Sequence, residues 1–427
     1  MAIAGTTNIN DTAAMKLETI QKIMDMVKLA QTVYKEIPGF DPTHYGFEGI
    51  KAITFDGLGK NGQKTKVFAY YGLPELASLT DKVPAVVLLH GGGGHPYLEW
   101  IKMWNDRGYA AIAFDNTGFF PTNVNAGYGE GYNDWVYGLE GSFNEQGYIN
   151  APNNDGVFTT NDAVEDMWLY HAVGQTLLVN NILRSDNRVD LNKIGAVGIS
   201  WGGVILSIAL GYDNRFAFAI PIYGSGYLDE SLAWIKNHFS MSNTQAIWSA
   251  ANNFGSVNMP VLWLCWNDDY CFSINSNSKS YLDTVKNNSN TLLSIKHAMY
   301  HSHAMGWTQM ESMQFADSVV KNGVKLTSFV NQPVGVEIST HINIDAEAEL
   351  VSAALYYITQ SMTYSEHAKY HNAVSTYMDQ IWQTTPLKIS GDTVFGEVPS
   401  ETVGYYIELK TNINGDVYTT TSVYTTI

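Results

Sequence analysis

The serine at position 200 is the strongest candidate for chemistry in this chain. It stands in Gly198-Ile199-Ser200-Trp201-Gly202, between the apolar runs Ile194–Ile199 and Val204–Leu210. These runs predict a strand, a sharp turn and a helix, in which the glycines allow close approach and the serine takes a strained backbone. A hydroxyl displayed in this way is typical of a nucleophile in acyl transfer. A glycine-rich turn with an idle serine is the alternative.

A cluster of glycines could hold the oxyanion that such an attack creates. The run Pro84–Leu89 predicts a strand buried on both faces, and it ends in His90-Gly91-Gly92-Gly93-Gly94. Because consecutive glycines lose much backbone entropy and pack nothing, they indicate that a ligand approaches the main chain there. We expect two oxyanion donors, the N–H of Trp201 and that of Gly92 or Gly93, and the sequence leaves the choice of glycine open. A flexible turn is the alternative.

A carboxylate and a histidine follow the serine in the order that such a site requires. The buried run Val261–Cys265 leads into Asp268 and Asp269, either of which could orient a histidine and stabilise its imidazolium form. Past the run 292–296, His301 and His303 are better placed than His297, because a triad histidine lies several residues beyond its strand. The order Ser, Asp, His is that of hydrolases with this type of turn.

Other reactive residues favour no further chemistry. No set of His, Cys or Glu residues at zinc spacing accompanies the histidines, so we expect no metal and no cofactor. Cys265 and Cys271 are too few for a disulfide framework and are interpreted as buried free thiols. His171 lies on a mostly apolar helix, which favours a hydrogen-bonded structural role.

Strands and helices alternate along the segments that would position these residues. Helical spacing begins at the N-cap Asp11-Thr12 and continues to Tyr34, ahead of Pro38. The further helices are expected at 98–107, 162–183, 204–210 and 309–321, and the strands at 50–55, 64–71, 84–89, 109–115, 194–199, 216–223, 261–265 and 292–296. This alternation predicts a mostly parallel sheet flanked by helices, and the turn at Ser200 makes it an α/β-hydrolase fold.

The long stretch 116–161 predicts a cap over the site. It is rich in Gly, Asn, Tyr and Trp, has no clear period, and leaves the strand end where α/β enzymes bind ligands. Tyr132 and Trp135 are candidate substrate-binding residues, together with Tyr128 and Tyr137. Aromatic residues that only pack the cap onto the body are the equal alternative.

The chain after Gly323 predicts a second type of domain. Short β-like runs rich in Thr, Tyr and Val, with turn signals between them, indicate an immunoglobulin-like β-sandwich of about 100 residues. We therefore expect a helical segment at 1–48, a catalytic domain at 49–325 and an accessory domain at 326–427. Trp382 is interpreted as a buried tryptophan of the sandwich rather than a sugar-binding platform.

Composition excludes several classes of partner. Hydrophobic residues make up 45% and charged residues 15% of the 427 residues, which excludes a largely disordered chain. A formal net charge of −17 would repel nucleic acid and anionic lipids, so neither is an expected partner. Without a signal peptide or long apolar segment, the sequence as given predicts a soluble, cytoplasmic protein, and a secreted one if the native N-terminus differs. A homo-oligomer is compatible with these features.

Beyond about Lys51, the chain resembles bacterial acetylxylan esterase-like and prolyl-oligopeptidase-like α/β-hydrolases that carry a C-terminal β-domain. The resemblance lies in the serine motif and in Leu89–Gly94, Trp168–Val173, Arg188–Asp190, Arg215-Phe216, Pro221–Gly226 and Met299–His303. It implies a serine esterase that removes acetyl or other small acyl groups from carbohydrate esters of the xylan type. A prolyl-oligopeptidase-like peptidase and a non-catalytic carbohydrate-binding protein on a hydrolase scaffold remain the alternatives.

The same resemblance implies a role for each residue of the site. With Ser280-Tyr281 setting the register, the acid falls on Asp269. The family has glycine where this chain has Trp266 and asparagine where it has Asp268, a departure that keeps Asp268 open as the acid. The pattern selects His301 as the general base and makes His303 a neighbour that contacts the substrate.

Overall fold

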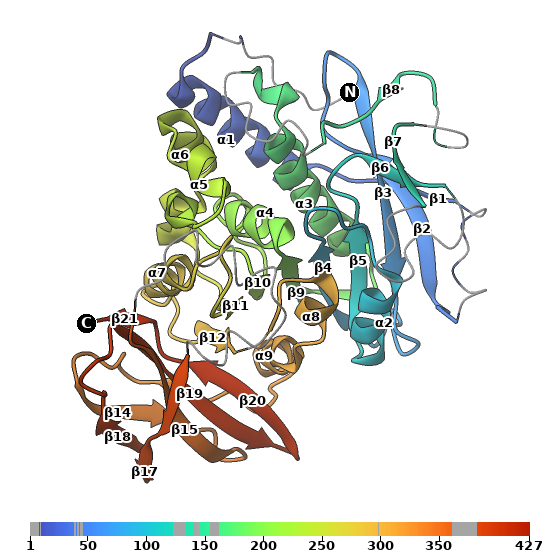
Figure 1. Ribbon diagram of the computed structural model, residues 1–427. Helices are drawn as coiled ribbons and strands as arrows, with labels where there is room; N and C mark the ends of the chain where they lie inside the picture. The colour runs from blue at the N-terminus through green and yellow to red at the C-terminus, as the bar shows by residue number, and fades with distance from the viewer. Residues whose placement is uncertain are drawn as a thin grey trace. The chain divides into compact units, whose positions relative to one another are not determined.

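The computed structural model (Figure 1) describes residues 8, 10–37, 40, 42, 46–122, 134–139, 143, 145–153, 162–297, 299–360 and 382–427. The chain divides into two compact units. The first unit comprises Met1–Gly224 and His238–Val257, and the second comprises Ser225–Asn237 and Asn258–Ile427. Each unit has its own sheets and helices.

A mixed sheet with parallel central strands forms the first unit. Its strands lie in the order β1-β2-β3-β5-β4-β9-β10. β4 pairs in parallel with both β5 and β9, and β9 pairs in parallel with β10, whereas β1, β2, β3 and β5 pair antiparallel. The bounds are β1 (Tyr34–Glu36), β2 (Ile50–Asp56), β3 (Lys64–Gly72), β4 (Val83–Leu89), β5 (Ala110–Phe114), β9 (Val189–Ile199) and β10 (Ala219–Ile222). All residues of β4 and β5 are buried, as a sheet covered on both faces requires.

The longer helices of this unit pack on the sheet or on one another. α3 (Trp168–Ser185) and α4 (Trp201–Ala209) lie side by side on β9, with α1 (Ala13–Leu29) along α3, and α2 (Leu98–Asp106) packs on β3 and β5 (Figure 1). The shorter elements are β6 (Phe119–Pro121), β7 (Trp135–Tyr137), β8 (Tyr148–Ile149), α6 (Ser242–Trp248) and the 3₁₀ helices η4 (Val164–Asp166) and η6 (Ala250–Ser256). This alternation, with a serine between β9 and α4, is the α/β-hydrolase fold that the sequence predicts.

The first helix is shorter than its spacing predicts. Thr12 caps α1 as expected, because its hydroxyl accepts a hydrogen bond from the Met15 N–H. The helix ends at Leu29, however, and Tyr34–Glu36 pairs antiparallel with β2. The Tyr34 ring packs edge-on against Tyr71 at 6.2 Å. The backbone ladder and this contact outweigh the local helical preference.

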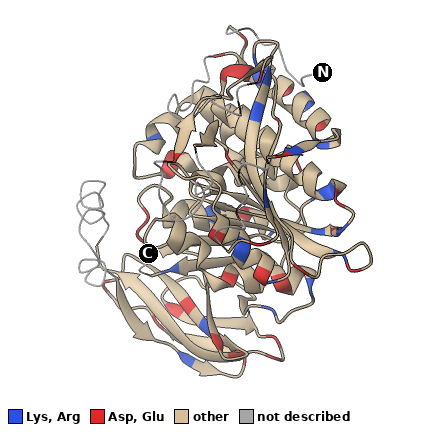
Figure 2. Ribbon diagram, turned by 90° about the vertical axis from the view of Figure 1, so that its right-hand side faces the viewer, with Lys and Arg blue, Asp and Glu red and all other residues tan. Residues whose placement is uncertain are grey.

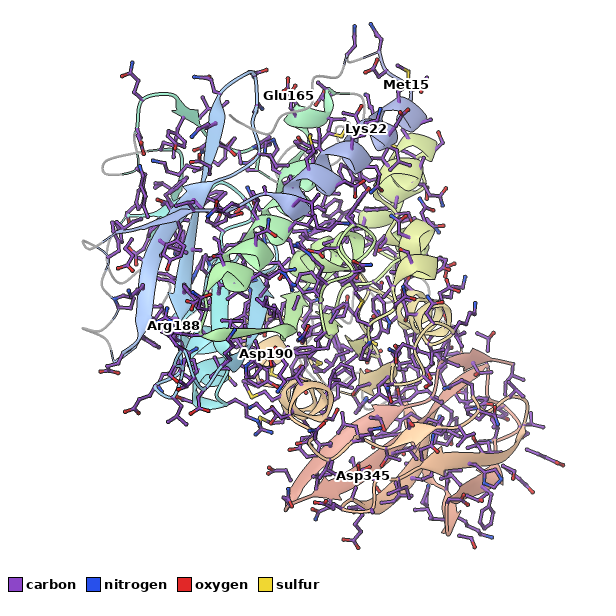
Figure 3. The ribbon with its side chains drawn as sticks, turned by 180° about the vertical axis from the view of Figure 1, so that it is seen from behind. Met15, Lys22, Glu165, Arg188, Asp190 and Asp345 are labelled. Atoms are coloured by element: carbon purple, nitrogen blue, oxygen red, sulfur yellow. The ribbon has the colours of Figure 1, made fainter. Side chains whose placement is uncertain are left out.

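A charged turn anchors the start of β9, the strand that leads to Ser200. The Arg188 guanidinium donates to both carboxylate oxygens of Asp186, and Tyr71 donates to the same carboxylate. Burial alone would raise the pKa of Asp186, but these hydrogen bonds outweigh it and lower the pKa to about 2. Arg188 and Asp190 are labelled in Figure 3. The turn therefore ties the end of α3 to the beginning of β9.

The second unit combines a parallel strand pair with two antiparallel sheets. β11 (Leu262–Trp266) pairs in parallel with β12 (Leu292–Lys296). The sheets follow the orders β13-β14-β18-β17 and β16-β15-β19-β20, with β21 beside β19. The remaining bounds are η5 (Leu228–Glu230), α7 (Ile274–Thr284), α8 (His303–Trp307), α9 (Met310–Val320), β13 (Ser328–Phe329), β14 (Glu337–Asn343), β15 (Glu349–Ile358), β16 (Gln383–Pro386), β17 (Lys388–Ser390), β18 (Thr393–Glu397), β19 (Gly404–Ile413), β20 (Asp416–Thr421) and β21 (Thr425–Thr426), while α5 (Ile235–Phe239) falls partly in each unit's range.

The two antiparallel sheets share one apolar core, which makes them the predicted β-sandwich. β14 alternates exposed and buried residues along its whole length, the pattern of a strand with one buried face. The core side chains come from both sheets: Phe329, Ile338, Ile342, Ala353, Leu355, Leu387, Val394, Val398, Tyr405, Ile407 and Leu409. The sandwich is joined to β12 within the unit, since the Ser294 hydroxyl donates to the Thr419 carbonyl and the Ile295 N–H donates to the Thr421 hydroxyl.

Charges are spread along the ribbon rather than gathered in one place. Figure 2 shows acidic and basic residues interspersed on the helices and strands that the structure describes. Within that part of the chain, no helix combines the length and the apolar character needed to cross a membrane.

Candidate active site

Ser200 lies at a strained turn between β9 and α4. Its φ of 56° and ψ of −120° are rare for a residue with a side chain, and such a conformation costs on the order of 1–3 kcal/mol. Two backbone hydrogen bonds hold it: the Ser200 N–H donates to the Ile222 carbonyl at 2.7 Å, and the Val204 N–H donates to the Ser200 carbonyl at 3.0 Å. The strand, turn and helix predicted around the serine are therefore present, with the serine as the residue that carries the strain.

Two glycines of the motif are required by close backbone approach. A Cβ atom at Gly198 would lie 2.2 Å from the Gly202 carbonyl oxygen, and one at Gly202 would lie 2.1 Å from the Leu89 carbonyl oxygen. Neither position has room for a side chain. The second contact also brings the first turn of α4 against the end of β4, where the glycine run begins.

The glycine run forms a tight turn directly after β4. The Gly94 N–H donates to the Gly91 carbonyl at 3.1 Å, and Gly93 has a φ of 67°. Gly92 and Gly93 are exposed at the tip of this turn. Trp201 is the first residue of α4. The N–H groups in the first turn of an α-helix do not take part in the hydrogen bonds within the helix, and the Trp201 N–H is one of them. All four predicted residues of this half, Ser200, Trp201, Gly92 and Gly93, thus belong to the first unit.

A buried histidine, His90, anchors the glycine turn, although its place in the sequence assigns it no role. The Asn116 N–H donates to Nε2 of His90 at 3.1 Å, so the proton is on Nδ1, which donates to the Gly91 carbonyl at 2.8 Å. The Asn116 amide also donates to the His90 carbonyl. The turn is therefore held to the segment that follows β5. The signals in the sequence are that His90 directly precedes the glycines and lies within the Leu89–Gly94 motif of the resemblance.

The second unit brings a histidine and a carboxylate together. Nδ1 of His301 lies 2.6 Å from Oδ2 of Asp269. The other carboxylate oxygen accepts the N–H groups of Cys271 and Phe272 at 2.9 and 3.0 Å, so the carboxylate has a fixed orientation. The His301 ring stacks on Phe272 with centroids 5.7 Å apart. This pairing is the one that the resemblance implies for Asp269 and His301.

The neighbouring histidines have other surroundings. The Asn267 amide donates to Nδ1 of His297 at 3.0 Å, and the His297 ring packs on Tyr356 of the sandwich. His303 begins α8, whose N-cap is Ser302. His301 has the hydrogen bond to Asp269 described above. A substrate contact of His303 stays a prediction.

Asp268 is buried and has a different partner from Asp269. Its Oδ1 accepts a hydrogen bond from the indole N–H of Trp382 at 2.9 Å, and among the described residues Oδ2 has no hydrogen-bond partner. Burial raises the pKa of Asp268 to about 6, although the Trp382 hydrogen bond acts in the opposite direction. Trp382 is only 5% exposed, which agrees with its predicted place as a buried tryptophan.

Asp268→Asn is expected to stabilise the protein more at pH 7 than at pH 4. Because its folded-state pKa of about 6 lies above the ordinary value of 3.8, folding favours the protonated carboxyl. That contribution to stability is complete below about pH 4 and is lost as the pH rises through 6, by at most about 3 kcal/mol. Asparagine mimics the uncharged form at every pH. The difference in Tm between variant and wild type should therefore grow by a few degrees between pH 4 and pH 7.

Asp416→Asn, at an exposed position of β20, is the matched control and should show no such growth. If Asp268→Asn differed from the wild type by the same Tm at both pH values, Asp268 would not be a buried carboxyl with a raised pKa.

The predicted cap is described only in part. Trp135 on β7 is 4% exposed, stacks on His95 at 5.1 Å and meets Phe68 edge-on at 5.5 Å. These contacts match the packing alternative left open for the aromatic residues of the cap. Tyr137 is 45% exposed, and its hydroxyl donates to the Ala151 carbonyl. Tyr128 and Tyr132 lie outside the described residues, so their proposed roles stay predictions.

The remaining reactive residues are His171 and the two cysteines. His171 is fully buried with Nε2 2.8 Å from the Glu165 carbonyl oxygen, and burial lowers its pKa to about 4. Both cysteines are free as predicted, but only Cys265 is buried, whereas Cys271 is partly exposed. The partial burial of Cys271 raises the pKa of its thiol to about 12. Within the described residues, no three His, Cys, Asp or Glu side chains are grouped so as to hold a metal ion.

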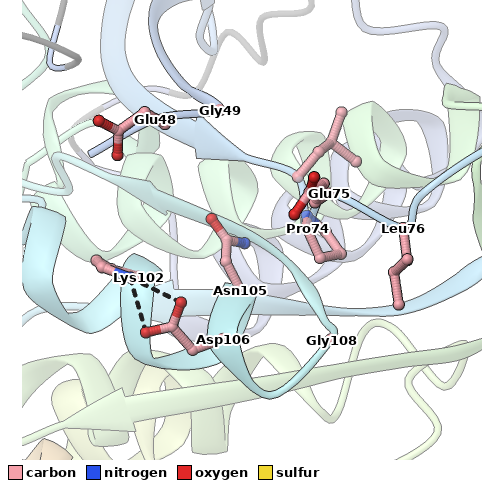
Figure 4. Close-up of a pocket in the computed structure, with 10 residues that line it drawn as sticks. Glu48, Gly49, Pro74, Glu75, Leu76, Lys102, Asn105, Asp106 and Gly108 are labelled. Atoms are coloured by element: carbon pink, nitrogen blue, oxygen red, sulfur yellow. Dashed lines mark hydrogen bonds and ion pairs between the residues drawn. The ribbon is translucent and has the colours of Figure 1, made fainter. Parts of the chain in front are cut away.

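A cavity of about 720 Å³ lies elsewhere in the first unit (Figure 4). Glu48, Glu75, Lys102 and Asp106 are among the ten residues drawn around it, and Lys102 pairs with Asp106 at 2.7 Å. None of these ten residues is a serine, cysteine or histidine. The cavity therefore lacks the side chains for the chemistry considered above.

No protein-family model matches the chain, and no curated protein matches it. Among solved structures, the acylaminoacyl peptidase of Pyrococcus horikoshii is 18% identical over 65% of this chain, with a TM-score of 0.44. An acetyl xylan esterase from a Paenibacillus species is 18% identical, covering 74% of this chain and 96% of its own, with a TM-score of 0.49. One from a Thermoanaerobacterium species is 17% identical, covering 71% and 93%, with a TM-score of 0.47. This chain spans 43% of the length of the peptidase.

Proposed function

We propose that this protein is a serine hydrolase of carboxylic esters, with Ser200 as nucleophile, His301 as general base and Asp269 as the triad acid. The observation that carries the proposal is the backbone of Ser200, a non-glycine residue at a φ of 56° on the turn between β9 and α4. Strain of this kind persists only where the surrounding structure over-determines it, and it displays the hydroxyl. The hydrogen bond between His301 and Asp269 supplies the oriented base that such a nucleophile requires.

The proposed reaction proceeds through an acyl-enzyme. His301 takes the proton of the Ser200 hydroxyl as the oxygen attacks the ester carbonyl, and the N–H groups of Trp201 and of Gly92 or Gly93 stabilise the oxyanion. The tetrahedral intermediate collapses, and the alcohol leaves with the proton from His301. Water then attacks the acyl-enzyme while His301 accepts its proton. The second collapse releases the carboxylic acid and restores the Ser200 hydroxyl.

The substrate class in this proposal comes from the resemblance of the motifs to acetylxylan esterases. We therefore propose acetyl or other small acyl groups on carbohydrates of the xylan type as the substrate. The reaction as written needs the ester, water and the residues named, without a cofactor.

A probe and a substrate panel test this function. A fluorophosphonate should label the wild-type protein at Ser200, as mapped by peptide mass spectrometry. Acetylated xylo-oligosaccharides, feruloyl esters, simple aryl esters and aminoacyl-naphthylamides should then be assayed side by side. We expect the highest kcat/KM for an acetyl ester.

Two outcomes of the same experiment favour the alternatives. Faster turnover of aminoacyl-naphthylamides than of every ester would favour the peptidase. A wild-type protein that neither reacts with the fluorophosphonate nor hydrolyses any member of the panel would favour the carbohydrate-binding protein.

A further inference from the structure

The loop after β11 is held by the sandwich of the same unit. Trp382 donates from its indole to Oδ1 of Asp268 at 2.9 Å, and the Asn267 amide donates to the Tyr406 hydroxyl at 3.4 Å. The next side chain, Asp269, has a different partner, His301. Two consecutive residues of the loop are therefore fixed to the sandwich, and the third holds the histidine.

Trp382 is itself held in place by a group of aromatic rings. Its indole meets the ring of Tyr406 edge-on at 5.3 Å and that of Tyr424 at 6.1 Å. Tyr406 in turn stacks on Tyr356 at 5.2 Å, with the rings 7° from parallel. Tyr356 and Tyr406 belong to neighbouring strands, β15 and β19. Large rings packed in this way leave the indole few rotamers, so its N–H is a donor with a fixed position.

The hydrogen bond from Trp382 is the main interaction that fixes the position of the Asp268 carboxyl. The carboxyl is buried, and among the described residues its other oxygen accepts no hydrogen bond. Without the indole, both oxygens would be buried and unpaired, which strongly favours a shift of the loop that exposes them. One peptide bond separates Asp268 from Asp269, so such a shift would reach the carboxylate that lies 2.6 Å from His301.

We propose that Trp382 is a positioning residue, which keeps Asp269 aligned with His301 through its hydrogen bond to Asp268. The inference rests on the proposed function, because the aligned pair is the one assigned to activate Ser200. It gives the sandwich a role in the reaction: a residue 114 positions after Asp268 in the chain supports the triad acid.

Trp382→Phe removes the donor and keeps most of the ring, so it tests the proposal directly. For a small aryl acetate, kcat should fall between about 10-fold and 100-fold, the scale for a misplacement near 1 Å, while KM stays within about twofold. The acidic limb of the pH–rate profile should move to lower pH, because a misaligned carboxylate stabilises the imidazolium less. A merely structural role would leave that limb in place.

Changes at the partner residue complete a double-mutant cycle. Asp268→Ala removes the acceptor and also the buried carboxyl whose exposure would shift the loop. It should therefore lower kcat less than Trp382→Phe does, and the double variant should be no slower than Trp382→Phe alone. Asp268→Asn keeps an acceptor oxygen for the indole and should retain more activity than Asp268→Ala. Effects that multiply in the double variant would overturn the proposal.

Trp104→Phe is the matched control for loss of a buried indole. Trp104 is 1% exposed on α2, and among the described residues its N–H has no hydrogen-bond partner. The kcat and the pH–rate profile of Trp104→Phe should match those of the wild type. An equal loss in both tryptophan variants, or an unchanged profile in Trp382→Phe, would contradict the role of Trp382.

A second readout separates this inference from the proposed function. The proton between His301 and Asp269 should give a far-downfield ¹H NMR signal that is absent from His301→Gln and weakened or shifted in Trp382→Phe but not in Trp104→Phe. If the wild type reacts with the fluorophosphonate and the downfield signal is unchanged in Trp382→Phe, the role proposed for Trp382 is wrong while the proposed function stands. If the signal responds as expected but the wild type shows no label and no turnover, the alignment stands and the proposed function fails.

Discussion

Ser200→Ala is expected to lower kcat for an acetyl ester by more than about a thousandfold, because it removes the atom that attacks the carbonyl. The residual rate would come from the oxyanion donors and from substrate binding. Alanine must adopt the same positive φ, so the turn should retain its shape and Tm should change little. Steady-state kinetics on an aryl acetate, with fluorophosphonate labelling of the same sample, measures the effect.

Ser207→Ala is the matched control for this prediction. Ser207 is a buried serine on the same helix, and its hydroxyl donates to the Gly203 carbonyl within α4. The Ser207→Ala variant should keep kcat within about threefold, because it loses only one hydrogen bond between a side chain and the backbone of its own helix. Ser200→Ala with more than about a thousandth of the wild-type rate would show that another residue is the nucleophile.

Asp269→Asn is expected to lower kcat by about ten thousandfold, the scale for a triad acid that loses control of its histidine. The structure gives a specific reason. The N–H groups of Cys271 and Phe272 donate to Oδ1, so the amide oxygen of the variant must occupy that position. The amide nitrogen then faces His301, whose Nδ1 must accept a hydrogen bond. The ring proton moves to Nε2, and the histidine is no longer a base toward the serine.

Asp268→Asn decides between the two carboxylates that the sequence left open. Its oxygen still accepts the Trp382 N–H, so we expect a loss of no more than about tenfold in kcat. Tm measured for both variants separates catalysis from stability. A larger loss for Asp268→Asn than for Asp269→Asn would transfer the role of triad acid to Asp268.

The sequence predicted the fold around the serine because the signals there are local. Gly198 and Gly202, on either side of Ser200, allow a close approach of backbone that a side chain at either position would block. The apolar runs before and after Ser200 correspond to β9 and α4. The strand predicted at 292–296 is β12, with the same bounds. Tyr34 shows where local spacing fails: its backbone pairs with β2, and no helical pattern could reveal that pairing.

The amino-acid sequence alone therefore specified which residues could form the site and in what order they follow one another. These are a glycine turn after β4, a serine displayed between β9 and α4, then the carboxylates and finally the histidines. Tertiary structure decided which of them meet. Asp268 and Asp269 are adjacent and chemically identical, yet one faces an indole more than a hundred residues away and the other faces a histidine. The direction of a loop side chain depends on the partners that folding brings to it. Those partners, Trp382 and His301, lie in other loops of the chain, and no short pattern encodes how these loops pack.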